Sequence, residues 1–176
     1  MTDLDKEIDD FISSALSRLT PGIKVISEEA ENIIETGLSQ YWLVDPIDGT
    51  RGFVDGSDEF CINVALIQAR HPVLALIYIP VKNQYFVATA NLPHAYGYLD
   101  GIKVKLSTNK TNRFGQLRLL TGRCSPSDKV IRSPLSGDNP FWVVKRCHRA
   151  LKFTQICLGQ ADVYIRFGAT SLWDVA

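Results

Sequence analysis

Two aspartates stand three positions apart, directly after an apolar run, in the segment Asp45-Pro46-Ile47-Asp48-Gly49-Thr50. Pro46 fixes one backbone dihedral angle between them, so the segment can direct both carboxylates toward one point and turn the Ile47 carbonyl inward. Hard oxygen ligands of this kind suit Mg²⁺ or Mn²⁺. Because unpaired charge is costly to bury, we expect a cation at this position.

The end of the same segment suits an anion. Gly49 and Thr50 supply backbone N–H groups where the chain could enter a helix, which favours a phosphate oxygen. A cation site and an anion site would therefore share one segment. The alternative is an ordinary acidic turn after a strand, since Asp, Pro and Gly are common turn formers.

Carboxylates occur in two further places where apolar residues give way to charge. Glu28 and Glu29 follow the strand-like run Lys24–Ser27, and Asp174 lies inside an apolar segment far along the chain. In order and local context, these positions and residues 45–50 match the signature of the inositol monophosphatase-like family of Mg²⁺-dependent, lithium-sensitive phosphatases. The chain resembles this family over nearly its whole length.

Within this family the sequence is most similar to the CysQ-type 3′(2′),5′-bisphosphate nucleotidases, which are associated with sulfur metabolism. The segments that carry this likeness are Ser27–Glu29, Tyr41–Arg51, Glu59–Phe60, Asn63–Ile67, Leu151–Phe153, Gly159–Tyr164 and Arg166–Gly168. The resemblance implies a hydrolase that acts on a nucleotide such as 3′-phosphoadenosine 5′-phosphate.

Some positions depart from the nucleotidase pattern. Gly52 replaces an acidic residue, Asp55–Ser57 replaces a basic segment, and His148-Arg149 replaces a pair of small residues. These changes keep two alternatives open. One is the same chemistry on an inositol or sugar monophosphate, and the other is an inactive, truncated remnant of the family.

The resemblance also implies the fold, which is a layered α/β (α+β) arrangement known as an αβαβα sandwich. Family members begin with a helix and a strand before the position of Met1 and continue beyond the Trp173-Asp174 motif. We therefore expect residues 1–176 to form a single, partial domain that is incomplete at both termini.

The resemblance assigns the metal ligands by position. Glu28, Asp45 and the Ile47 carbonyl would hold one Mg²⁺, while Asp45, Asp48 and Asp174 would hold a second. Two or three ions per site are expected. Such ions stabilise charge on the transferring phosphoryl group and lower the pKa of a bound water, so the expected nucleophile is water.

Catalytic and substrate-binding roles follow from the same resemblance. Thr50 would accept a hydrogen bond from the attacking water and would be oriented by Asp5. Glu28 would assist through its metal-bound water. The residues expected to bind substrate are Gly49, Thr50, Arg51, Lys152 and Arg166.

Composition is that of a globular protein, with 45% hydrophobic residues and a formal net charge of +0. It is not the profile of a protein that coats a nucleic acid polymer, and a small phosphorylated substrate is what the resemblance implies. No apolar run is long enough to span a bilayer, and the acidic N-terminus is unlike a secretory signal, so we expect a cytoplasmic protein. The oligomeric state is left open.

The cysteines show no zinc spacing and are interpreted as reduced thiols without assigned chemistry; they are Cys61, Cys124, Cys147 and Cys157.

Hydrophobic periodicity predicts alternating helices and strands. Apolar residues recur at helical spacing from Leu4 to Leu19, and Pro21-Gly22 stops the helix. An antiparallel meander is predicted from the strand-like runs Cys61–Gln68, Val73–Pro80 and Gln84–Ala88. Shorter strands are predicted at Lys103–Leu106, Leu117–Thr121 and Ala161–Phe167, a helix or strand at Phe153–Leu158, and a loop at Arg123–Asn139.

Overall fold

The computed structural model describes residues 3–30, 37–54, 56–108, 117–122, 142–147, 150–166 and 169–173. The chain divides into two compact units. The first contains Met1–Lys105 with Thr170–Ala176, and the second contains Leu106–Ala169. The single domain over residues 1–176 stays a prediction.

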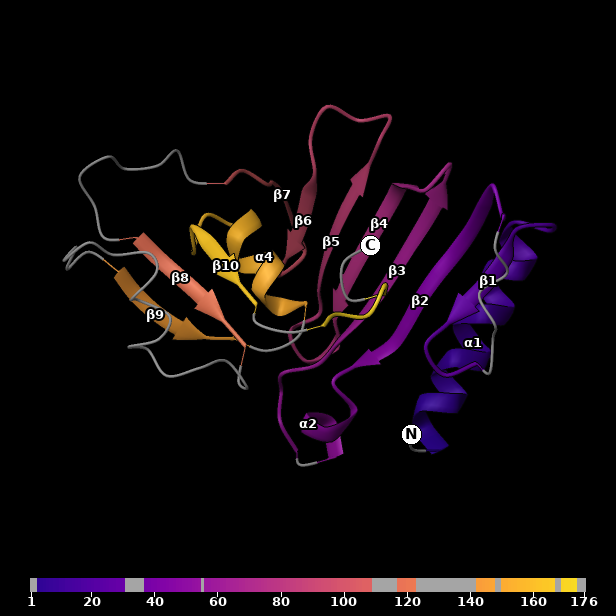
Figure 1. Cartoon of the computed structure of the whole chain (residues 1–176), viewed down its shortest axis with the longest axis horizontal. Coiled ribbons are helices and arrows are strands. Elements are labelled where there is room, and N and C mark those ends of the chain that lie inside the picture. The colour runs from indigo at the N-terminus through magenta and orange to yellow at the C-terminus, as the bar shows by residue number, and fades with distance from the viewer. Residues whose placement is uncertain are drawn as a thin grey trace. The chain divides into compact units, whose positions relative to one another are not determined.

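A seven-stranded sheet forms the first unit, with its strands in sequence order from β1 to β7 (Figure 1). β1 pairs parallel to β2, and every later pair in this sheet is antiparallel. The strands are β1 (Lys24–Ser27), β2 (Gln40–Asp48), β3 (Cys61–Gln68), β4 (His71–Ile79), β5 (Gln84–Thr89), β6 (Tyr96–Leu99) and β7 (Ile102–Lys105). The predicted meander is therefore confirmed, although β6 was not predicted.

Short elements connect these strands. The tight turn between β3 and β4 places Ala69 and Arg70 at φ 48° and 68°, the left-handed region used by type I′ hairpin turns. The five-residue helix α2 (Thr50–Val54) follows β2, and the 3₁₀ turn η1 (Pro80–Lys82) follows β4. The chain thus enters a helix at Thr50, as its sequence predicts.

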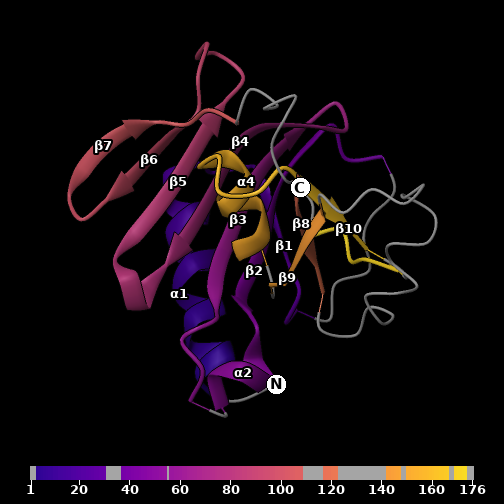
Figure 2. The ribbon, with the colours of Figure 1, turned by 90° about the vertical axis from the view of Figure 1, so that its left-hand side faces the viewer.

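The helix α1 (Asp3–Leu19) covers one face of this sheet (Figure 2). Its residues Ile12 and Leu16 pack against the buried cluster Trp42, Val44 and Val64. The Trp42 Nε1–H also donates a 2.8 Å hydrogen bond to Thr20 Oγ1, just beyond the end of the helix. The amphipathic helix predicted from periodicity is confirmed, and it buries one side of β2 and β3.

The opposite face of the sheet has its own apolar cluster. Ile26, Leu43, Ala65 and Ile67 are buried there. Because side chains alternate across a strand, Leu43 points away from the face that Trp42 shares with α1. Trp173, among the last described residues, packs against this second cluster.

The second unit contains a parallel sheet of three strands in the order β10-β8-β9. These strands are β8 (Leu117–Thr121), β9 (Trp142–Arg146) and β10 (Val163–Ile165), and the helix α4 (Leu151–Cys157) precedes β10. The helix settles the alternative left open for residues 153–158. β9 was not predicted, and the predicted loop at residues 123–139 lies outside the described residues. In the described parts of both units, no helix is long and apolar enough to cross a membrane.

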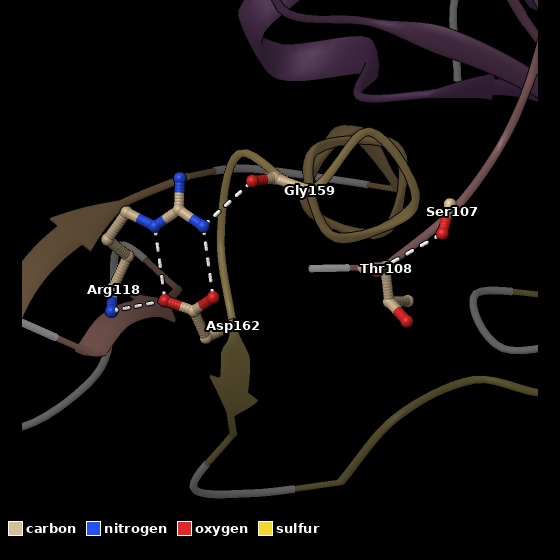
Figure 3. Close-up of polar contacts among 5 residues, drawn as sticks. All are labelled: Ser107, Thr108, Arg118, Gly159 and Asp162. Carbon is tan, nitrogen blue, oxygen red and sulfur yellow. Dashed lines mark hydrogen bonds and ion pairs between the residues drawn. The ribbon is translucent and has the colours of Figure 1, made fainter. Parts of the chain in front are cut away.

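An ion pair fixes the start of β8 to the turn before β10 (Figure 3). Arg118 Nε and Nη2 donate to the two carboxylate oxygens of Asp162 at 3.1 and 3.0 Å. The Arg118 backbone N–H donates to the same carboxylate at 2.8 Å, and Nη2 also reaches the Gly159 carbonyl at 2.7 Å. These hydrogen bonds hold the pKa of Asp162 below its usual value, against the opposing effect of burial.

Candidate metal centre

A β-bulge at the end of β2 brings the two aspartates to one face of the first sheet. Asp45 lies opposite Asn63 on β3, and Asp48 lies opposite Cys61, with a register shift between them. Cys61 and Asn63 are two residues apart and therefore share a face. Asp45 and Asp48, three residues apart, share that face as well, because the bulge inserts one extra residue.

This geometry corrects one detail of the sequence interpretation. The sequence analysis places Asp45–Asp48 after an apolar run, in a segment that turns the two carboxylates toward one point, but this segment forms the last part of β2 itself. The carboxylates of Asp45 and Asp48 converge because the paired strand contains a bulge between them. Pairing with β3 restrains the backbone at Asp45 and at Asp48, so the two side chains stand on a more rigid support than a free loop would provide.

Both aspartates are buried, with Asp45 1% exposed and Asp48 9% exposed. The Cys61 thiol donates to Asp48 Oδ2 at 3.7 Å. The chemistry at this bulge is therefore that of hard oxygen donors, with one thiol beside them.

A hydroxyl and a third aspartate lie beside this bulge. Thr50 Oγ1 is 3.3 Å from Asp5 Oδ1 and 3.4 Å from the Ile47 carbonyl oxygen. Asp5 is fully buried in the first turn of α1. The preceding Gly49 has φ 124°, a conformation that favours glycine, and its carbonyl accepts from Phe53 N–H at 3.0 Å as α2 begins. The fold thus brings together the predicted pair Asp5 and Thr50.

The end of β1 lies beside the same point of β2. Ser27 is the register partner of Val44, and the Glu28 N–H donates to the Val44 carbonyl at 3.0 Å. Glu28 is exposed and lies next to Asp45 across the parallel pair of β1 and β2. The pKa of Glu29 is raised, mainly by burial and then by repulsion from the Asp5 carboxylate.

For two predicted residues of this centre, Asp174 and Arg51, the structure does not describe the side chain. Asp174 lies outside the described residues, but Trp173 packs on the face that holds Leu43, and Asp45 follows Leu43 by two positions on that face. Arg51 lies in α2, and its side chain is outside the description. Within the described ranges, no group of three His, Cys, Asp or Glu side chains is close enough to hold one metal ion. The complete ligand sets stay a prediction.

The two predicted substrate contacts of the second unit differ in exposure. Lys152 is buried in the first turn of α4, with its Nζ 4.7 Å from the ring centroid of Phe153 and 5.0 Å from that of Tyr164. Aromatic faces stabilise an ammonium group at such distances. Arg166 follows β10 and is exposed. Their role toward substrate stays a prediction.

The residues present fit a hard divalent cation. The bulge offers two carboxylates and the Ile47 carbonyl, all oxygen donors. Across from Asp45, the Asn63 side chain is only 9% exposed, and neither of its amide atoms forms a hydrogen bond with the described part of the chain. Buried polar groups of native proteins are normally satisfied, so an unsatisfied amide at this place is consistent with a hydrated ion.

Sequence reasoning missed the neighbours of the aspartates. It gave no role to Glu29, Cys61 or Asn63, although the last two directly face the metal-ligand candidates. A signal was available, because polar or thiol side chains alternate with apolar ones at the start of the strand-like run 61–68. Its meaning depended on the register of β3 against β2, which the bulge sets.

Comparison with known proteins places the whole chain in one group. The sequence profile described as "Inositol monophosphatase family" matches residues 1–176. A 3′(2′),5′-bisphosphate nucleotidase CysQ of Haemophilus influenzae is 33% identical over 179 residues, which cover 100% of this chain and 66% of that protein. The corresponding CysQ of Escherichia coli K12 is 32% identical over 169 residues, covering 94% of this chain and 65% of that protein. The chain thus spans slightly less than two thirds of the length of these relatives.

Solved structures give the same grouping. The crystal structure of CysQ from Bacteroides thetaiotaomicron matches with a TM-score of 0.82 and 26% identity, covering 97% of this chain and 68% of that one. An IMPase/NADP phosphatase complexed with Mg²⁺ and phosphate matches with a TM-score of 0.80 and 22% identity, covering 99% and 64% of the two chains. The layered α/β fold predicted from the sequence is confirmed by these likenesses.

Proposed function

The chain belongs to the inositol monophosphatase family, and from this we propose that it is a Mg²⁺-dependent phosphomonoester hydrolase acting on 3′(2′),5′-bisphosphate nucleotides such as 3′-phosphoadenosine 5′-phosphate. The likeness to CysQ nucleotidases at 33% and 32% identity supports this choice of substrate. In the cytoplasm, such an activity would remove a by-product of sulfur assimilation.

One structural observation carries the proposal: the bulge in β2 directs the buried Asp45 and Asp48 to the same face. Glu28, Asp45 and the Ile47 carbonyl would hold one Mg²⁺, and Asp45, Asp48 and Asp174 a second. Bound there, the ions would supply Lewis-acid stabilisation of the phosphoryl group and a lowered pKa for the attacking water.

The contact between Thr50 and Asp5 supports a role in handling the proton of that water. A hydroxyl has one hydrogen and two lone pairs. When Thr50 Oγ1 donates its hydrogen to Asp5 Oδ1, 3.3 Å away, its lone pairs remain to accept from water. Thr50 would therefore orient the nucleophile, and Asp5 would act as a positioning residue that fixes the direction of the hydroxyl.

Substrate binding needs groups of opposite charge to phosphate. We assign the backbone N–H groups of Gly49 and Thr50 and the side chain of Arg51 to the phosphate that is hydrolysed. Lys152 and Arg166 are the proposed contacts of the rest of the nucleotide. Two phosphates distinguish this substrate from an inositol monophosphate, so cations away from the reacting phosphate are the feature that the nucleotidase proposal requires.

Phosphate release tests the proposal. The chain is assayed with Mg²⁺ on 3′-phosphoadenosine 5′-phosphate, inositol 1-phosphate and a sugar monophosphate, each with and without Li⁺. We expect the highest kcat/KM on the nucleotide and inhibition by Li⁺. A preference for inositol or sugar phosphate would replace the substrate assignment and leave the metal centre standing, whereas no release from any substrate would contradict the hydrolase proposal for this chain.

A further inference from the structure

Asn63 is a buried polar side chain to which the described part of the chain gives no hydrogen bond. It lies on β3 between Asp45 of β2 and Ile77 of β4 and is 9% exposed. Neither Nδ2 nor Oδ1 has a partner among the described residues. Its neighbours along the strand, Val64 and Ala65, are buried apolar residues.

Such a side chain lowers the stability of the free protein. Leaving a buried amide unsatisfied costs its full desolvation, whereas an apolar side chain of the same shape at that position is neutral or stabilising. Leucine has nearly the shape of asparagine and would suit the strand. An amide at this position therefore calls for a role that an apolar residue cannot perform.

The register points to that role. Side chains of directly opposite residues in an antiparallel pair share a face, with Cβ atoms about 4.5–5.5 Å apart. The Asn63 amide is therefore within reach of the Asp45 carboxylate, which is itself 1% exposed. An amide is also the suitable donor, because a lysine or arginine would compete with a cation for the carboxylate and an aspartate would add repulsion.

We propose that Asn63 is a positioning residue of the metal centre, whose Nδ2–H donates to the Asp45 carboxylate when divalent ions are bound. This inference rests on the proposed function, because it requires that Asp45 be a metal ligand. Hydrogen bonds to metal-ligating groups fix their orientation, and removing them typically lowers metal affinity by about 10–100-fold.

The test compares metal affinity with the stability of the metal-free protein. Mg²⁺ is titrated by calorimetry into the wild type and Asn63→Leu, and thermal unfolding is recorded without metal. We expect Asn63→Leu to bind Mg²⁺ about tenfold more weakly or worse, with an unfolding midpoint equal to or above that of the wild type. A merely structural role would lower the midpoint and leave the affinity unchanged.

Val64→Ala is the matched control on the same strand. Val64 is buried on the opposite face, in the cluster that α1 covers, so its truncation should lower the unfolding midpoint with no change in Mg²⁺ affinity. If Asn63→Leu does not fold, Asn63→Ser and Asn63→Ala decide the question, because only serine keeps a donor. We then expect tighter Mg²⁺ binding by the serine variant.

The outcomes separate this inference from the proposed function. Wild-type affinity in folded Asn63→Leu, or equal affinities of the serine and alanine variants, would overturn the role of Asn63 while the metal centre stands. Absence of Mg²⁺ binding by the wild type would overturn both. Weaker binding by Asn63→Leu at unchanged stability supports both.

Discussion

The carboxylates of the two units have different surroundings. In the second unit, Asp162 receives two N–H groups of the Arg118 guanidinium and one backbone N–H. In the first unit, the groups facing Asp45 and Asp48 across the sheet are a neutral amide and a neutral thiol. The arginine satisfies the Asp162 carboxylate within the fold, whereas the residues opposite Asp45 and Asp48 on β3 carry no cationic side chain that would compete with a metal ion.

Carboxyl pKa values shift in opposite directions in the two regions. The hydrogen bond from Arg118 holds the pKa of Asp162 below its usual value. Near the metal centre, burial and the charge of Asp5 raise the pKa of Glu29. The lowered pKa of Asp162 marks a carboxylate stabilised inside the chain, whereas the ionised form of Glu29 is disfavoured first by burial and then by the Asp5 charge.

The largest expected effect comes from Asp45→Asn. Removing the carboxylate that would contact both ions should reduce phosphate release about a thousandfold, equivalent to about 4 kcal/mol in the activation barrier. It should also abolish the rise in unfolding midpoint that Mg²⁺ produces in the wild type. The measurements are steady-state kinetics and thermal unfolding at increasing Mg²⁺. A Mg²⁺-dependent rise of wild-type size in this variant would exclude Asp45 as a ligand.

Thr50→Ala should have the next largest effect, and on rate alone. Groups that handle a proton in the transition state contribute about 10²–10⁴-fold, so we expect kcat to fall about a hundredfold. Mg²⁺ affinity should stay at the wild-type value, since only the hydroxyl hydrogen-bonded to Asp5 is lost. Thr50→Ser keeps that hydroxyl and should restore most of the rate. Equal rates for the serine and alanine variants would remove the hydroxyl from the mechanism.

Asp162→Asn tests the other side of the comparison. We expect a lower unfolding midpoint, by about 3 °C, and unchanged Mg²⁺ affinity. The effect is modest because the Arg118 side chain is 37% exposed and water screens the pair. Loss of Mg²⁺ binding in this variant would show that the division between a structural and a metal-binding carboxylate is wrong.

The same substitution has a predictable pH dependence. A carboxyl group whose pKa is lowered by folding contributes stability above its ordinary pKa of about 3.9, and this contribution is lost as the pH falls through the lower folded value. The stability difference between the wild type and Asp162→Asn should therefore be constant near neutral pH and shrink below about pH 4. Thermal unfolding across this range gives the measurement, and a difference that grows toward acid pH would contradict the assigned direction.

Cys61→Ala should produce the smallest change. It removes one weak hydrogen bond to Asp48 Oδ2, at 3.7 Å. A typical hydrogen bond contributes about 0.5–1.5 kcal/mol net, and this long one should contribute no more than that. We therefore expect about a threefold loss of Mg²⁺ affinity. Cys157→Ala, in the second unit, is the matched control and should leave the affinity unchanged. A loss as large as that of Asp45→Asn would make the thiol a direct ligand.

Local patterns predicted the elements of the first unit well. The helix from residue 3 to 19 and the strands at 61–68 and 84–89 follow from periodicity because each buries one face against a neighbour. β6 was missed because Gly97 lies inside it and the residues before it, such as Pro93, are typical of turns. β9 was missed because its partner β8 lies far from it in sequence, and a short parallel strand carries little local signal.

For the candidate site, the sequence proposes residues but not their geometry. The spacing of Asp45 and Asp48 and the resemblance to a family identified the carboxylates. Their common face depends on a bulge, and the roles suggested for Asn63 and Cys61 depend on the pairing of β2 with β3. Such long-range register is decided by the burial of whole strands, which no short motif contains.

The most direct test of the central claim is a crystal structure of the chain grown with Mn²⁺, with anomalous scattering used to locate the ions. We predict anomalous peaks beside the carboxylates of Asp45 and Asp48, with the side chains of Glu28 and Asp174 as further ligands. An ordered Asp174 side chain too distant from Asp45 and Asp48 to share an ion, with no peak at the bulge of β2, would contradict the account.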